Sequence, residues 1–89
     1  VFADSTVPTH VPDGSLVLGT MLLAASSIGL GSCWINRAKE AFETGEGKAL
    51  KTAWGIEETY VGVGNCILGY VKGSLPAPAP RKADYIVTV

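Results

Sequence analysis

The sequence of 89 residues predicts a mixed fold of α-helices and β-strands. Three observations support this prediction. A long apolar run at helical spacing precedes Gly29, two shorter amphipathic patterns follow it, and further segments are rich in Val, Ile and Tyr, as strands are. A chain of this length forms one compact domain at most, and it buries only about 60–68% of its unfolded surface.

The N-terminal half predicts a strand, a loop and one long helix. Residues 1–3 are short and apolar, and a loop with two prolines follows. Asp13 is expected to cap a helix over residues 14–28, because its carboxylate can accept hydrogen bonds from the first-turn N–H groups. Gly29 is expected to end that helix. Its apolar residues occupy nearly every side, which predicts a helix buried all round.

The C-terminal half predicts two short helices, a strand and an extended arm. A surface helix is expected around residues 38–42, and a second helix, capped by Thr44, up to Trp54. Residues 60–71 are apolar on both alternating faces, which predicts a central strand covered on both sides. The alternating prolines of residues 75–80 predict an extended arm that carries a last β-like segment, residues 85–89.

The composition excludes several classes of function. The net charge is −1 and the basic residues are scattered, so the chain lacks the basic patch of a nucleic-acid-binding protein. The apolar run 16–30 is interrupted by polar residues and falls short of the ~20 residues of a membrane span. Hydrophobic residues make up 47% of the chain, which predicts a face meant for the rest of a domain or for a partner subunit.

The sequence also lacks the motifs of metal sites and of unaided side-chain catalysis. Cys33 and Cys66 are too far apart for a CxxC motif, and His10 is the only histidine. The two cysteines are expected to be buried free thiols of a cytoplasmic protein. GxSxG, Walker A and HExxH sequences are absent, and the glycines of residues 62–69 lie within an expected strand, unlike a dinucleotide-binding fingerprint.

The segment GLGSCWI, residues 29–35, is the most informative part of the chain. Taken alone it predicts a helix cap followed by the start of a buried strand. The alternative is a binding site, in which free backbone N–H and C=O groups beside small side chains receive a flat aromatic ligand.

Together with ILGY at residues 67–70 and PRK at residues 80–82, this segment resembles the C-terminal half of the nitroreductase-like flavoproteins, which carry FMN. The resemblance covers nearly the whole chain. It implies an α+β fold with a mainly antiparallel sheet flanked by helices. Residues 1–89 would then be the C-terminal portion of a single domain whose N-terminal half is missing, which agrees with a chain that starts at Val1 inside an expected strand.

The resemblance implies a ring-binding role for residues of the GLGSCWI segment. In this family the corresponding loop lies against the isoalloxazine ring, with backbone N–H groups facing the pyrimidine edge and N5. The residues concerned here are Gly31, Ser32, Cys33 and Trp34. Cys33 is expected to act as a small filler and not as a covalent group. Both Trp34 and Trp54 are expected to be core anchors more than substrate platforms.

Arg81 and Lys82 are the candidates for the FMN phosphate. From residue type alone, the two side chains are expected to be solvated and to bind nothing. The alternative is a phosphate site, because a guanidinium beside an ammonium can bind a phosphate. In the family a basic cluster before the terminal strand holds the phosphate, and Arg81 stands where its Arg is expected. Ala79 departs from the pattern, because many members have another Lys there.

The resemblance further implies a homodimeric oxidoreductase with FMN at the subunit interface. Such enzymes pass a hydride from NAD(P)H to flavin N5 and then reduce a nitroaromatic, quinone or similar acceptor, so no catalytic side chain is assigned. The arm is expected to carry residues 85–89 onto the partner's sheet. Two alternatives are a non-catalytic dimerisation or scaffold fragment, and a flavoenzyme of the same fold with other chemistry, such as reductive dehalogenation or flavin destruction.

Overall fold

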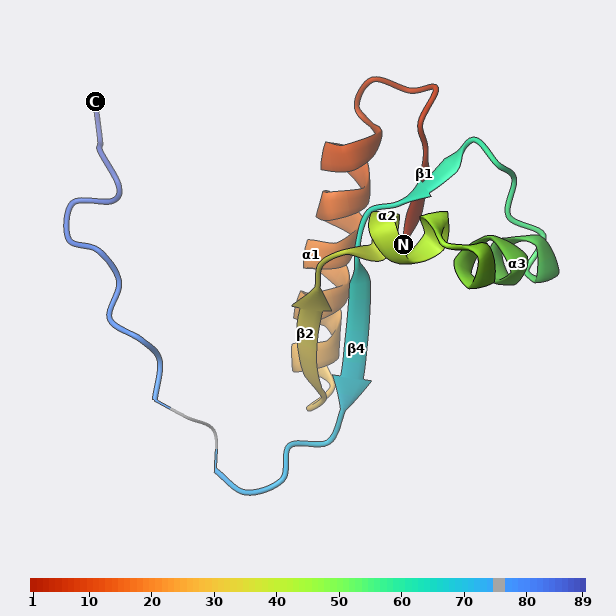
Figure 1. Cartoon of the computed structure of the whole chain (residues 1–89). Coiled ribbons are helices and arrows are strands. Elements are labelled where there is room, and N and C mark those ends of the chain that lie inside the picture. Colours follow the sequence, from red (N-terminus) through yellow and green to blue (C-terminus); the bar gives the residue numbers. More distant parts are fainter. Residues whose placement is uncertain (75–76) are drawn as a thin grey trace.

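The computed structural model describes residues 1–74 and 77–89 (Figure 1). The chain forms three helices and two antiparallel pairs of strands in its described residues, which confirms the predicted α+β class. The elements are, in order, β1 (Phe2–Asp4), α1 (His10–Ser27), β2 (Gly31–Ile35), α2 (Ala38–Glu43), α3 (Gly45–Ala53), β3 (Tyr60–Gly62) and β4 (Asn65–Gly69).

The strands form two separate antiparallel pairs. β1 pairs with β3, with Ala3 opposite Val61, and β2 pairs with β4, with Cys33 opposite Ile67. The prediction of one continuous strand over residues 60–71 was therefore wrong. The chain crosses from the first strand pair to the second between β3 and β4. Residues 60–71 therefore contribute one strand that pairs with β1 and another that pairs with β2.

Hydrogen bonds from the start of the chain hold this crossing point. The Val63 N–H donates to the Val1 carbonyl at 3.0 Å, and the Val1 backbone nitrogen donates to the Gly64 carbonyl at 2.8 Å. A Cβ on Gly64 would lie 2.7 Å from Leu18 Cδ1 and 2.8 Å from Trp34 Nε1. Only glycine fits here without displacing a neighbour, because the α1 and β2 side chains close over the backbone.

Helix α1 begins four residues earlier than predicted, at His10. Asp13 lies in its first turn and is not its cap; the carboxylate accepts a hydrogen bond from Thr9 Oγ1 at 2.7 Å. Pro12 is tolerated in this turn, because first-turn N–H groups have no partner within a helix. Gly29 does end the helix, with a φ of +78° and the Leu30 N–H bonded to the Ala25 carbonyl at 2.9 Å.

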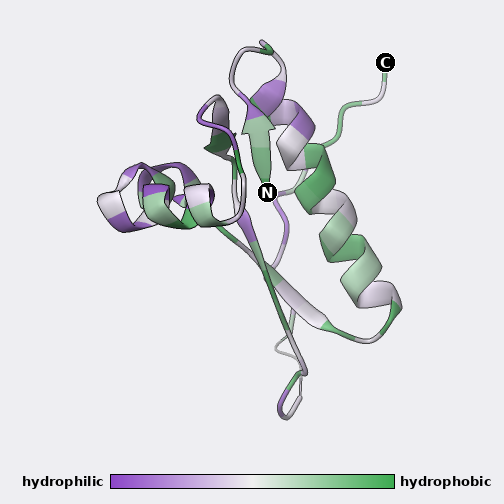
Figure 2. Cartoon of the chain, turned by 90° about the vertical axis from the view of Figure 1, so that its right-hand side faces the viewer, coloured by the Kyte–Doolittle hydropathy of each residue, from purple (hydrophilic) through white to green (hydrophobic). Residues whose placement is uncertain are grey.

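One stripe of α1 is buried and the opposite flank is open. Gly14, Leu18 and Ala25 are buried where the helix packs on the strands. On the open flank, Leu16 is 72% exposed and Leu23 is 74% exposed. The prediction that the helix is buried on every side is therefore wrong for this chain by itself. The strands cover one side of the helix only, and the hydrophobic colouring of α1 in Figure 2 continues beyond that side.

The two short helices follow the prediction more closely. Thr44 caps α3, because its Oγ1 accepts a hydrogen bond from the Gly47 N–H at 3.1 Å. Gly55 follows that helix with a φ of +69°. Helix α2 is anchored by Ala38, which is buried under Gly62; a Cβ on that glycine would lie 2.6 Å from the Ala38 carbonyl carbon.

The C-terminal segment extends away from the helices and strands (Figure 1). No strand forms over residues 85–89 in the chain, and 79% to 85% of Tyr85, Ile86 and Val87 is exposed. Such a segment needs a sheet edge to satisfy its backbone, and it pairs with none of the described strands. Of the predicted arm 75–80, residues 75 and 76 lie outside the described residues. Within the described ranges, no helix is both long and apolar enough to cross a membrane.

Candidate functional site

Strand β2 places the four ring-binding candidates in one extended segment. Gly31, Ser32, Cys33 and Trp34 follow one another along it, each opposite a residue of β4. Because side chains alternate across a strand, Ser32 and Trp34 share one face, and Cys33 and Ile35 share the other. The structure therefore divides the candidates between two faces.

The face of β2 and β4 that carries Cys33 is open and apolar. Ile35 is 41% exposed, Ile67 opposite Cys33 is 55% exposed, and Cys33 itself is exposed. Neither cysteine forms a disulfide, which confirms the predicted free thiols, but the expectation that both are buried was wrong. The face lacks charged side chains, since its remaining members are Gly31, Asn65 and Gly69.

Strand β2 also has an open edge. Among the residues that the structure describes, only β4 pairs with it, so every second residue directs its N–H and C=O away from that partner. The prediction of free backbone groups is thus correct for one edge only, because the groups on the other edge are bonded to β4. These groups lie next to the apolar face, and together they offer hydrogen-bond donors beside a flat surface.

Trp34 supports β2 from its other face. The indole lies over Gly64 beside Leu18, and its Nε1 donates to Asn36 Oδ1 at 3.2 Å. This half-buried position agrees with an anchoring role. Trp54 differs from the prediction: it packs on Phe42 with ring centroids 5.9 Å apart, yet 57% of it is exposed.

Asn36 and Arg37, which follow β2, were not predicted as site residues from the sequence. Arg37 adopts a left-handed conformation, with a φ of +68°, directly before α2. A non-glycine residue there is under backbone strain, which is often found at binding sites. Asn36 is held by the Trp34 indole. Residue type alone could not reveal this turn, because a glycine is usual where φ is positive.

Gly31 has a structural reason to be glycine. A Cβ on it would lie 3.0 Å from Val71 Cγ2 and 3.3 Å from the Gly69 carbonyl oxygen. The packing of the chain itself therefore favours a small residue at this position, since a Cβ would need Val71 to move by a few tenths of an ångström. A ligand is not needed to explain it.

The structure does not bring Arg81 and Lys82 to β2. Both are exposed and lie on the C-terminal segment, away from the strands (Figure 1). Their role toward a phosphate stays a prediction.

One carboxylate, Asp4 in β1, has a shifted pKa. Hydrogen bonds from the Thr6 backbone N–H and Oγ1, at 3.0 and 2.9 Å, lower the pKa of Asp4. Across the described part of the chain, no cluster of His, Cys, Asp and Glu side chains could hold a metal ion. The open face of β2 is thus the site with the clearest binding geometry.

Comparison with known proteins identifies the family. The model of the nitroreductase family matches residues 9–70, which include α1, β2 and β4. The chain belongs to the nitroreductase family. Its fold is similar to that of a nitroreductase with bound FMN from Bacteroides fragilis NCTC 9343, with a TM-score of 0.86 and 30% sequence identity.

The match covers 99% of this chain and 48% of the Bacteroides fragilis chain, so this nitroreductase-family chain spans about half the length of that protein. No curated protein matches it. The resemblance to nitroreductases and the predicted fold are confirmed. The family match ends before Arg81 and Lys82.

Proposed function

We propose that this chain is the C-terminal portion of an FMN-dependent oxidoreductase domain of the nitroreductase type. The observation that carries the proposal is the uncharged, exposed face of β2 and β4 at Cys33, Ile35 and Ile67. A flat ring on this face would cover apolar side chains and lie beside the N–H groups of the open strand edge. The similar structure with bound FMN supports this assignment.

The residues present fit the ring of FMN better than its phosphate. The segment Gly31 to Trp34 offers backbone donors, an open face and Trp34 as a support from behind. A phosphate needs cations, and Arg81 and Lys82 are the candidates. They lie on the extended C-terminal segment, so we place the phosphate contact where that segment meets a flavin of the assembled enzyme.

Bound FMN would supply the redox chemistry, accepting a hydride from NAD(P)H and reducing a nitroaromatic, quinone or similar small molecule. The chain contributes placement and electrostatics. Backbone N–H donors of β2 would stabilise negative charge at the pyrimidine edge of the ring, since such donors are pre-oriented by the strand. No side chain of the chain is assigned a proton transfer.

The assembly we propose is a homodimer. The open flank of α1, with Leu16, Leu23 and Ile28, would be covered by the N-terminal half of the domain and by the partner subunit. Residues 85–89 would add a strand to the partner's sheet, and the N-terminal half would supply the remaining FMN contacts.

The absorbance spectrum of the full-length protein that contains this sequence tests the proposal. After incubation with FMN and gel filtration, a flavin band in the visible blue is expected, together with acceptor-dependent oxidation of NAD(P)H. A protein that elutes without flavin contradicts it.

A non-catalytic assembly role is the second candidate, and the exposed flank of α1 favours it. This role predicts a stable complex of the two halves that retains no flavin.

A further inference from the structure

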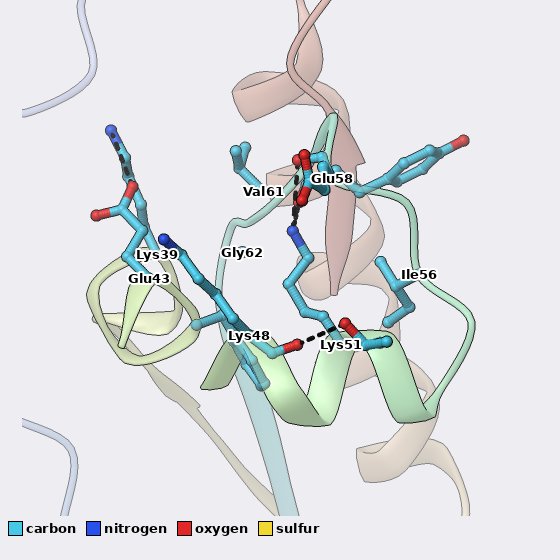
Figure 3. A pocket seen from close by; sticks show the side chains of 11 residues that line it. Lys39, Glu43, Lys48, Lys51, Ile56, Glu58, Val61 and Gly62 are labelled. Atoms are coloured by element: carbon cyan, nitrogen blue, oxygen red, sulfur yellow. Dashed lines mark hydrogen bonds and ion pairs between the residues drawn. The ribbon is translucent and has the colours of Figure 1, made fainter. Parts of the chain in front are cut away.

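A cavity of about 330 Å³ lies between α2, α3 and β3 (Figure 3), and none of its lining residues belongs to β2. Its volume lies within the range of about 300–1,000 Å³ that is usual for small-molecule sites. Apolar side chains and cations share its walls. The apolar group includes Phe42, Ile56 and Val61, and the cations are Lys39, Lys48 and Lys51.

The three lysines differ in how their charges are used. The Lys39 ammonium lies 4.0 Å from the Glu43 carboxylate, so these two charges offset each other. Lys51 donates to the backbone carbonyls of Glu58 and Tyr60. Those acceptors hold its ammonium in place at the cavity wall without cancelling its charge, because they are neutral.

Lys48 is the cation available to a ligand. It lies three residues before Lys51 on α3, which puts both on one side of the helix. Figure 3 shows the Lys51 side chain pointing from α3 toward Glu58, and the Lys48 side chain pointing toward Lys39 and Glu43 of α2. With three lysines and two glutamates, Glu43 and Glu58, the lining carries one net positive charge in a chain whose net charge is −1.

We propose that this cavity binds a small aromatic carboxylate. The Lys48 ammonium would pair with the carboxylate, and Lys51 would add a second positive charge nearby. The aromatic body would contact Phe42 and Val61, which an inorganic anion would leave in contact with water. This site is independent of the flavin-binding face of β2.

Titration of the full-length protein that contains this sequence with benzoate, followed by amide NMR, tests the proposal. Saturable shifts are expected at the amides of Lys48, Val61 and Gly62. Lys48→Gln should weaken benzoate binding about fivefold, the loss of affinity expected when a partly exposed ion pair is removed. Lys48→Arg keeps the charge and should preserve the affinity. Lys72→Gln is the matched control, because it removes the same charge from an exposed position outside the cavity.

Benzamide, a neutral molecule of the same shape, serves as the ligand control and is expected to bind more weakly than benzoate. The proposal is overturned if benzamide binds as well as benzoate, or if Lys48→Gln and Lys72→Gln weaken binding equally. Shifts confined to residues outside the cavity, or no shifts at all, also overturn it.

Discussion

The indole N–H of Trp34 donates a hydrogen bond to the side-chain oxygen of Asn36 across 3.2 Å. The bond spans the end of β2 and immediately precedes Arg37, whose backbone is left-handed. This hydrogen bond therefore links β2, which carries the proposed flavin face, to the turn at Arg37 that leads into α2. We infer that this contact holds the end of the face in place.

A double-mutant cycle of Trp34→Phe and Asn36→Ala measures this contact. Each change removes one partner of the bond, so the two should be coupled by about 0.5–1.5 kcal/mol in the free energy of unfolding. Urea unfolding of the two single variants and the double variant gives that value. Strictly additive effects would show that the bond contributes nothing to stability.

Gly64→Ala should destabilise the chain by about 1–3 kcal/mol, because the new methyl group would press on Leu18 and Trp34. Gly19→Ala is the matched control: apart from the adjoining helix backbone, no atom of the chain lies within 4 Å of a Cβ placed there, and alanine should stabilise the interior of α1 by up to about 1 kcal/mol. Thermal unfolding compares the two. Equal effects would refute the close packing at the crossing point.

Arg81→Ala should lower FMN affinity in the full-length protein by roughly ten- to a hundredfold, the loss expected for a charge-assisted hydrogen bond to a phosphate. Fluorescence titration with FMN measures the dissociation constant. Lys72→Ala provides a control that removes the same charge from an exposed position. An unchanged constant for Arg81→Ala removes the residue from the phosphate site.

Truncation of the full-length protein after Gly73 should lower both dimer stability and FMN retention. The deleted segment includes Arg81, Lys82 and the exposed β-branched residues 86–89, whose backbone needs a partner strand. Sedimentation and flavin absorbance report the two properties. A truncated enzyme that stays dimeric and keeps its flavin excludes the exchanged arm.

Asp4 should titrate below the ordinary carboxyl pKa of about 3.9, because two donors of Thr6 stabilise its charged form. Its contribution to stability is therefore complete above that ordinary pKa and is lost as the pH falls through the lowered one. Thr6→Ala removes the hydroxyl donor and should move the pKa part of the way back. NMR titration of the Asp4 carboxyl checks both statements, and a pKa that Thr6→Ala leaves in place would contradict the assigned cause.

Local signals predicted several features correctly. Gly29 ends α1 and Thr44 caps α3, since each acts within one turn of its own helix. The resemblance to the family was drawn from residues 29–35, 67–70 and 80–82, and the first two of these segments lie in the part that the family model matches. Asp13 was misplaced because Thr9, Asp13 and their neighbours offer several helix starts, and residue type does not select among them.

By itself, the amino-acid sequence determined the C-terminal end of α1, the cap of α3, the free cysteines and the family, since each depends on residues close together or on a motif. Only the tertiary structure decided that residues 60–71 split into β3 and β4, because the division depends on hydrogen bonds with Val1, more than sixty residues away along the chain. It also decided which flank of α1 is open and that Cys33 and Trp34 lie on opposite faces of β2. Burial and pairing depend on which distant segments meet, and hydrophobicity alone does not specify the partner.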